Sequence, residues 1–190
     1  MKTADLITVS QWGAHCLNRF LPCSVGLKGI KTKKQEGDKA TPSGNFTLGP
    51  IFYRPDRINP RGVNMPKVQI RRDSLWSDDG NDEFYNQLVH SFSPWPFSHE
   101  KLFRPDPLYD MVIPVHYNSI APIAGKGSAI FLHIWRGPRI PTEGCIAFCR
   151  EDLLWLCRVI TPSTQIHINC GHWWGKGWNW AAKRGLKTVP

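Results

Sequence analysis

Short stretches of apolar residues, many of them alternating with polar residues, are spaced along most of this chain. Alternation with a period of two is typical of a half-buried β-strand, and a short unbroken apolar run is typical of a strand buried on both faces. Pro, Gly and Asn residues separate these stretches and indicate turns. The pattern predicts a mainly β fold, with strands at residues 6–9, 21–25, 45–48, 109–116, 128–135, 145–148 and 165–168.

Residues 151–160 have the most convincing helical pattern in the chain. Glu151 and Asp152 would lie in the first turn, where the helix dipole favours negative charge. The apolar positions recur on one face, and Thr161-Pro162 would end the helix because proline has no amide hydrogen to donate. We expect the buried face to consist of Leu153, Leu156, Cys157 and Ile160.

Two long stretches and the C-terminus lack a regular pattern. Residues 26–44 are rich in Lys and Gly, whereas residues 54–107 are rich in Pro, Asp, Asn and aromatic residues, with short strands expected at 67–70 and 87–90. Loops of such length in a compact domain are usually functional or disordered, and the aromatic content favours folded loops beside a substrate. The basic tail at 172–190 carries four Trp residues that could pack on the domain, against sugar rings or at a membrane interface.

The composition indicates one soluble globular domain. A chain of 190 residues with 41% apolar and 21% charged residues can bury a core of its own. The net charge of +9 favours anionic partners, but the basic residues are dispersed and no nucleic-acid motif occurs, so we expect no nucleic-acid partner. We expect no transmembrane segment, and either no cleavable export signal or a sequence that begins after one.

Six cysteines permit disulfides, but a domain of this size does not need them. No Cys-x-x-Cys pair occurs, which argues against zinc-ribbon and thioredoxin-like sites. Cys170 and His172 could join a zinc site only with further ligands, so we predict no metal and no cofactor. Cys157 fits the buried face of the expected helix.

The stretch from residue 127 to 147 carries the candidate chemistry. Its apolar strand delivers His133, and after a Pro-rich loop the chain turns through Thr-Glu-Gly into Cys145. A thiol is mostly protonated at neutral pH, and a nearby imidazole can take its proton and leave a strong nucleophile. Gly144 allows a tight turn, so backbone amides beside the cysteine could stabilise an oxyanion. On spacing alone, however, two unrelated buried residues are the commoner explanation.

This stretch resembles the L,D-transpeptidase catalytic domain, the YkuD-like family. The hallmark of that family is a strand-borne His, a loop, and then Ser/Thr-His-Gly-Cys followed by an apolar residue and Arg or Asn. His133 matches the first His, and Thr142, Gly144 and Cys145 match the second element. Residues 41–46, Thr-Pro-Ser-Gly-Asn-Phe, resemble an earlier Thr-Pro-x-Gly-x-Phe element of the family.

The resemblance extends over about residues 6–168. It implies a YkuD-like β-sandwich with a mixed sheet, long loops and one main helix near the C-terminus. We expect residues 1–170 to form the catalytic domain and residues 171–190 to be a basic, Trp-rich C-terminal tail.

Two departures from the family pattern affect the substrate side of the expected site. Glu143 replaces the second His, Ala147 replaces the Arg or Asn, and the loop before the cysteine is shorter than usual. These features are similar to a compact proteobacterial branch, in which Ser98-His99-Glu100 and Leu108-Tyr109-Asp110 are also familiar. The chemistry of that branch includes 1–3 cross-links, made from L-Ala of the first stem position to diaminopimelate, instead of 3–3 links.

The resemblance implies an acyl transfer between two peptidoglycan stems, the donor and the acceptor. Cys145 would attack a carbonyl at an L-centre followed by a D-residue, and an amine of diaminopimelate would resolve the thioester. His133 would act as base and then as acid, with its ring oriented by the backbone carbonyl of Ile134. The protein would work as a monomer in the periplasm.

Several side chains near the motif are expected to contact the substrate. Glu143 would hold a substrate amine or help to set the charge of His133, unless it is a solvated loop carboxylate. His116 lies on an expected strand and is more typical of core packing than of catalysis. Further substrate contacts are expected from Thr142, His99, Tyr109 and Arg136.

Two other functions remain open. A cell-wall cysteine peptidase or carboxypeptidase would share the first half-reaction and let water resolve the thioester. Papain-like peptidases place Cys before His in the chain, and the reverse order here favours the transpeptidase. A non-catalytic wall- or polyanion-binding protein would instead use the basic surface, keep its function without Cys145, and bind less tightly as salt rises.

Overall fold

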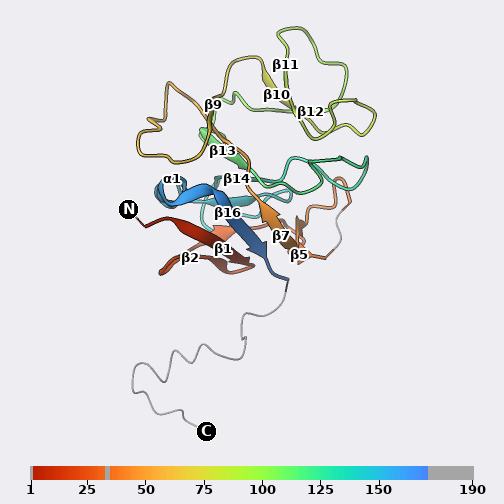
Figure 1. The fold of residues 1–190 in the computed structure, drawn as a ribbon. Coiled ribbons are helices and arrows are strands. Elements are labelled where there is room, and N and C mark those ends of the chain that lie inside the picture. Colours follow the sequence, from red (N-terminus) through yellow and green to blue (C-terminus); the bar gives the residue numbers. More distant parts are fainter. Residues whose placement is uncertain (1, 33–34, 171–190) are drawn as a thin grey trace, which may run out of the picture.

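Two large mixed sheets dominate the fold in the computed structural model, which describes residues 2–32 and 35–170 (Figure 1). The first sheet has the strand order β3-β2-β1-β16-β7, with β1 and β16 parallel at its centre. The N-terminal strands form two consecutive hairpins at one edge. The strands are β1 (Ala4–Ser10), β2 (Gly13–Cys16), β3 (Arg19–Leu21), β7 (Gly44–Thr47) and β16 (Ile160–Ile168).

The second sheet has the strand order β4-β15-β14-β13-β8-β9. Its strands β13 and β14 are buried along their whole length, which explains why their sequences are almost continuously apolar. β14 pairs antiparallel with β13 and parallel with β15. The strands are β4 (Cys23–Ser24), β8 (Ile51–Tyr53), β9 (Lys67–Gln69), β13 (Met111–Pro114), β14 (Phe131–Ile134) and β15 (Ile146–Phe148).

Two smaller sheets organise the irregular stretches. The first, ordered β11-β10-β12, forms the lobe at the top of Figure 1. The second is a parallel pair, β5 and β6, in the Lys- and Gly-rich stretch. These strands are β5 (Ile30–Lys31), β6 (Thr41–Pro42), β10 (Ser74–Ser77), β11 (Leu88–His90) and β12 (His99–Lys101).

The helix α1 (Arg150–Val159) begins directly after β15. Glu151 and Asp152 lie in its first turn, and its buried residues are Leu153, Leu156, Cys157 and Val159. The chain leaves the helix at Ile160 and passes at once into β16. The expected helix is therefore displaced by one residue at each end.

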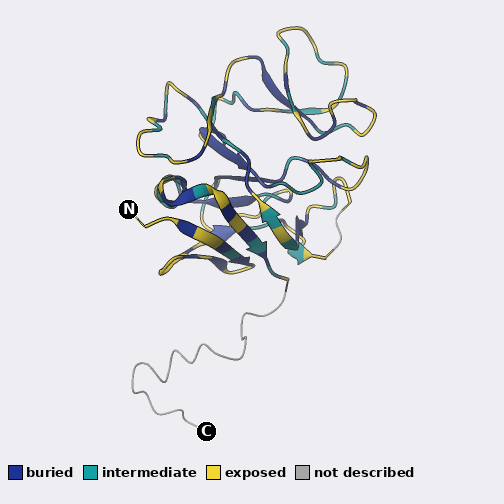
Figure 2. Ribbon diagram, viewed as in Figure 1, coloured by how far each residue is buried: buried dark blue, intermediate teal, exposed yellow. Residues whose placement is uncertain are grey.

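Two hydrophobic cores lie on opposite faces of the six-stranded sheet, whose central strands β13, β14 and β15 are buried throughout and dark blue in Figure 2. Ile113 and Leu132 face the main core, which they share with the other large sheet and α1. The alternate positions Val112 and Phe131 face the second core, beneath the β10–β12 lobe. There Trp76 of β10 packs edge-on against Phe131 with ring centroids 5.0 Å apart. Because side chains alternate along a strand, β14 contributes to both cores.

Asp110 joins the loop before β13 to the start of the helix. Its buried carboxylate accepts hydrogen bonds from Arg57 Nη1 and from Arg150 Nη1, each at 2.8 Å. The bond to Asp110 is the largest factor that raises the pKa of the Arg57 guanidinium. This contact holds the chain in place immediately before the strand that packs beside β14.

The prediction of a mainly β fold with one main helix near the C-terminus is confirmed. The single strand expected at 21–25 is wrong, because the chain passes at Pro22 from β3 in one sheet to β4 in the other. Proline has no amide hydrogen for the ladder, so the change of sheet occurs there. The pattern also missed β10, whose four residues are all buried although two are serines. The tail expected at 171–190 lies outside the described residues.

Candidate active site

A cavity of about 390 Å³ contains both members of the expected catalytic pair, Cys145 and His133. β14 presents Phe131 and His133 on one face because side chains two apart point the same way. The parallel strand β15 pairs Ala147 with His133. Cys145 is two residues before Ala147, immediately before this strand begins, and its side chain faces the same cavity.

The thiol is partly buried and contacts the backbone that leads into β14. Cys145 Sγ donates to the carbonyl oxygen of Ala129 at 3.2 Å, and the Phe131 amide donates to Sγ at 3.4 Å. Ala129 has φ of 50°, a left-handed conformation that is uncommon for a residue other than glycine. Its amide donates to Asn86 Oδ1 at 3.0 Å, which helps to hold this conformation.

The imidazole of His133 is buried and oriented by its own backbone. Its Nδ1 lies 2.8 Å from the carbonyl oxygen of Ile134. A carbonyl can only accept, so Nδ1 carries the hydrogen and Nε2 keeps a lone pair. Burial lowers the pKa of His133 to about 4, so the ring of the free protein is neutral at pH 7. Tyr109 packs edge-on against this ring, with centroids 5.4 Å apart.

The turn before the cysteine is closed by Thr142. Its hydroxyl donates to the carbonyl of Cys145 at 2.6 Å and accepts from the Gly144 amide at 3.2 Å. Gly144 has φ of 142°, where a side chain would be strained, so glycine is required for this turn. The Gly144 amide would have to give up its bond to Thr142 before it could donate to an oxyanion.

Thr41 connects the earlier Thr-Pro element to this turn. Its fully buried hydroxyl donates to the Gly144 carbonyl at 2.9 Å and accepts from the Gly26 amide at 2.9 Å. The Thr-Pro element resembles the family pattern, but its sequence predicts no role for Thr41. Nothing in the sequence pattern indicates which distant backbone group a threonine will bind.

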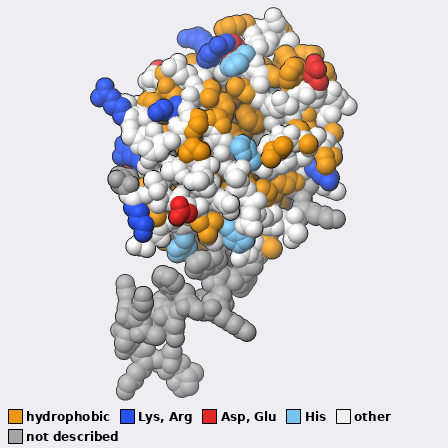
Figure 3. Space-filling model, viewed as in Figure 1, with side chains coloured by type: hydrophobic (Ala, Val, Ile, Leu, Met, Phe, Trp, Pro, Cys, Tyr) orange, Lys and Arg blue, Asp and Glu red, His pale blue; other side chains and the backbone are white. Residues whose placement is uncertain are grey.

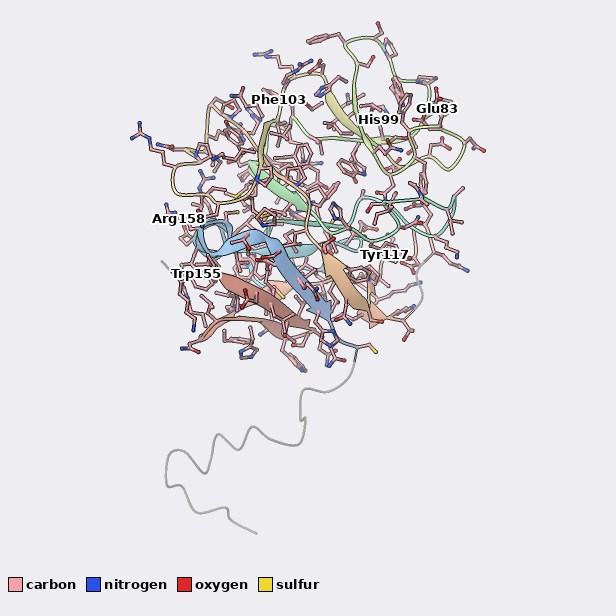
Figure 4. All side chains as sticks on the ribbon, in the orientation of Figure 1. Glu83, His99, Phe103, Tyr117, Trp155 and Arg158 are labelled. Carbon is pink, nitrogen blue, oxygen red and sulfur yellow. The ribbon has the colours of Figure 1, made fainter. Side chains whose placement is uncertain are left out.

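Four of the five residues expected to contact the substrate line the cavity, and the fifth, His99, does not. Tyr109 and Arg136 line the cavity, as do Thr142 and Glu143. The Glu143 side chain is 76% exposed, and its carboxylate lies 3.2 Å from Lys39 Nζ. His99 is not among the lining residues; its Nδ1 donates to the carbonyl of Phe97 at 2.8 Å, and Figure 4 shows it in the upper lobe.

The cavity also contains charged residues that the sequence pattern did not predict for the site. They lie in the two irregular stretches, where no periodic pattern predicts which side chains meet. These residues are Glu36, Asp78, Glu100 and Arg104.

A second cavity, of about 410 Å³, lies beside the first, and Ile130 and Phe131 help to line it. His116 is part of its wall, is half-buried and makes a hydrogen bond with Thr47 Oγ1 at 2.8 Å. The expectation that His116 belongs to the core is therefore only partly met. Cys145 and His133 are not among the residues that line this second cavity.

Neither a metal site nor a membrane span is found within the described part of the chain. No group of three or more His, Cys, Asp or Glu side chains in residues 2–32 and 35–170 is placed to hold a metal ion. The one helix in this part, α1, is too short to cross a membrane. On the face shown in Figure 3, the Lys and Arg side chains do not merge into one patch.

The sequence matches the YkuD family, the L,D-transpeptidase catalytic domain, over residues 12–168. This match covers most of the chain, and the protein therefore belongs to that family. The family acts on peptidoglycan stem peptides. A search of curated proteins with the sequence found no match.

Solved structures similar to this chain include two bacterial proteins. One is the helical cell shape determining protein Pgp2 from Campylobacter jejuni, with 16% identity and a TM-score of 0.47 over 90% of this chain. Another is an L,D-transpeptidase from Mycobacterium smegmatis, with 14% identity and a TM-score of 0.40 over 88% of this chain. The chain spans 48% of the first structure and 59% of the second.

Proposed function

We propose that this protein is a peptidoglycan L,D-transpeptidase that forms cross-links through a thioester on Cys145. The observation that carries the proposal is that Cys145 and His133 line the same cavity. The neutral ring, with its lone pair on Nε2, has the protonation state that a general base needs.

The reaction would proceed in two half-reactions. His133 Nε2 accepts the thiol proton, and the Cys145 sulfur attacks the carbonyl of an L-centre in the donor stem. The bond to the D-side breaks, and the imidazolium returns its proton to the leaving amine, which leaves a thioester and a neutral ring. An acceptor amine then attacks the thioester, its proton passes through His133 to the sulfur, and the new amide is released.

The surrounding residues have supporting roles in this proposal. The Ile134 carbonyl fixes the tautomer of the ring, and the Gly144 turn presents the cysteine. Thr142, Tyr109, Arg136 and the exposed Glu143 are available for contacts with the stems from the cavity wall. His99 does not line the cavity, so no direct contact with the stems is proposed for it.

We further propose that the links are of the 1–3 type, from L-Ala to diaminopimelate. The short loop between His133 and Cys145 and the replacement of the second motif histidine by Glu143 support this choice. We also propose that residues 1–170 form the catalytic domain, that residues 171–190 are a basic, Trp-rich C-terminal tail, and that the protein acts as a monomer in the periplasm, where its substrate lies.

The test is to incubate the protein with purified disaccharide-peptide stems and to identify the products by mass spectrometry. A cross-linked dimer, lacking either the peptide beyond the first residue or one D-residue, would support the proposal and identify the bond. Cys145→Ala should abolish the product while the protein remains folded. Cys170→Ala is the matched control, because this exposed thiol does not line the cavity.

The same experiment separates the alternatives. Shortened monomers without dimers would identify a cysteine peptidase or carboxypeptidase, in which water resolves the thioester. A non-catalytic binding protein would form no acyl-enzyme. It would still bind the cell wall after Cys145→Ala, and this binding would weaken steeply as the salt concentration rises. A mass increase on Cys145 after exposure to a carbapenem would demonstrate an acylable thiol.

A further inference from the structure

Asn86 lies outside the catalytic pair and does not line its cavity, but its side chain is bonded to the segment that holds the nucleophile. We propose that Asn86 is a positioning residue, which fixes the carbonyl group of Ala129 and, through it, the thiol of Cys145. The inference rests on the proposed function, because it assigns a role in the first half-reaction of that function.

The buried side chain of Asn86 uses both its oxygen and its nitrogen twice. Its Oδ1 accepts from Trp76 Nε1 at 3.1 Å and from the Ala129 amide at 3.0 Å. Its Nδ2 donates to the carbonyl oxygens of Tyr117 at 3.1 Å and Asn118 at 2.8 Å. An amide group offers two lone pairs and two N–H donors, so this set of partners allows one orientation of the side chain. Asn86 is therefore a fixed point against which Ala129 can be held.

Ala129 needs such support because its backbone is strained. Its φ of 50° lies in the left-handed region, which is costly for a residue with a Cβ atom and persists only where the surrounding structure imposes it. The bond from its amide to Asn86 Oδ1 is a contact of that kind. Without this bond, we expect the segment to relax and its carbonyl group to change direction.

The same segment contacts the sulfur of the nucleophile. Cys145 Sγ donates to the Ala129 carbonyl at 3.2 Å and accepts from the Phe131 amide at 3.4 Å. The direction of the S–H bond therefore depends on a residue whose conformation Asn86 supports. Attack on a carbonyl requires close alignment, and a displacement of about 1 Å can slow a reaction by about 100-fold.

A second connection joins the residue before Asn86 to the residue before Ala129. The hydroxyl groups of Tyr85 and Ser128 both donate to Glu36 Oε2, at 2.6 and 2.8 Å. Burial and the charge of Glu36 raise the pKa of Tyr85, so its hydroxyl stays protonated and remains a donor. Two adjacent connections restrict the rotation of the segment as well as its position.

The first test is the kinetics of acylation of Cys145 by a donor stem or a carbapenem, followed by intact mass. Asn86→Gly removes the side chain, and glycine tolerates the φ of 59° found at this position. This variant should lower the maximal rate of acylation by about 100-fold. The donor concentration at half-maximal rate should change little, because Asn86 does not line the catalytic cavity.

Asn86→Asp separates positioning from stability. Aspartate also tolerates the left-handed backbone, and one carboxylate oxygen can still accept from the Ala129 amide. Its second oxygen would face the carbonyl oxygens of Tyr117 and Asn118 without a hydrogen to donate, so the melting temperature should fall. The rate of acylation should nevertheless stay closer to that of the natural protein than the rate of Asn86→Gly does.

Thr164→Val is the matched control for the loss of buried hydrogen bonds. The fully buried Thr164 hydroxyl donates to the Ala4 carbonyl at 2.5 Å and accepts from the Thr161 amide at 2.8 Å, in the other large sheet. This substitution should lower the melting temperature and leave the rate of acylation unchanged.

The second test observes the thiol directly, by infrared spectroscopy of its S–H stretching band. The difference between the spectra of the natural protein and Cys145→Ala isolates this band from those of the other cysteines. Asn86→Gly should broaden the band and move it to higher frequency, because the S–H group loses a fixed acceptor. Asn86→Asp and Thr164→Val should leave the band in place.

The outcomes distinguish this inference from the proposed function. Rates of acylation that simply follow the melting temperatures of the folded variants, or a band unchanged in Asn86→Gly, would overturn the role of Asn86. If neither Asn86 variant folds, Tyr85→Phe removes a single hydroxyl of the second connection and should slow acylation by about five-fold, and an unchanged rate would overturn the inference. Failure of every donor and carbapenem to acylate Cys145 would refute the proposed function, whereas the S–H band would still report on Asn86.

Discussion

The buried imidazole of His133 should make the stability of this fold depend on pH. Burial lowers its pKa to about 4 from a usual value of 6.5. Between these values the unfolded chain binds a proton on this ring and the folded protein does not. Because the unfolded state then binds more protons, the free energy of unfolding falls as the pH falls.

The size of this effect follows from the difference between the two pKa values. One pKa unit corresponds to about 1.4 kcal/mol, so the fall from 6.5 to about 4 predicts a loss of about 3 kcal/mol. The loss should begin near pH 6.5 and be complete near pH 4, and above pH 7 the ring should contribute no pH dependence. Domains are commonly stable by about 5–15 kcal/mol, so a change of this size is readily measured.

The assay is urea unfolding, followed by tryptophan fluorescence, of the natural protein and of His133→Asn at several values between about pH 4.5 and 7.5. Asparagine can still donate to the Ile134 carbonyl but does not titrate. The stability of the natural protein relative to the variant should therefore decline by about 3 kcal/mol towards pH 4. His167→Asn, on β16 outside the cavity, tests whether loss of any imidazole has the same effect. If the natural protein and His133→Asn lose stability in parallel, the ring is not kept neutral by burial and the reasoning is refuted.

Two further substitutions test contacts around the site. Thr41→Val should lower the free energy of unfolding by about 1–3 kcal/mol and slow acylation of the cysteine, because the amide of Gly26 and the carbonyl of Gly144 lose their partner. Thr41→Ser keeps the hydroxyl and should restore both properties, so equal defects in the two variants would contradict this role. Asp110→Asn should lower the free energy of unfolding by about 2 kcal/mol, because two arginines lose a buried carboxylate partner. Asp56 is more exposed, and Asp56→Asn should lower it by less than about 1 kcal/mol. Thermal unfolding compares the two variants, and equal losses would show that burial of the carboxylate is unimportant.

The strand pattern was predictable wherever one or both faces of a strand are buried. β13, β14 and β15 were expected from their apolar runs, and the helix was expected from its buried stripe. The change of sheet at Pro22 was not, because the local pattern is apolar on both sides of the proline. β10 was missed since its burial comes from the lobe that packs around it and not from its own composition.

The sequence by itself indicated the family and the proposed pair of nucleophile and base, because these residues lie within one stretch that resembles the family motif. The tertiary structure alone decided that the imidazole is buried and neutral, and that Thr41 supports the turn. It also decided that three carboxylates line the cavity that contains the thiol. Glu36, Asp78 and Glu100 come from separate segments, and only long-range packing determines which of their side chains meet and how far water is excluded from them.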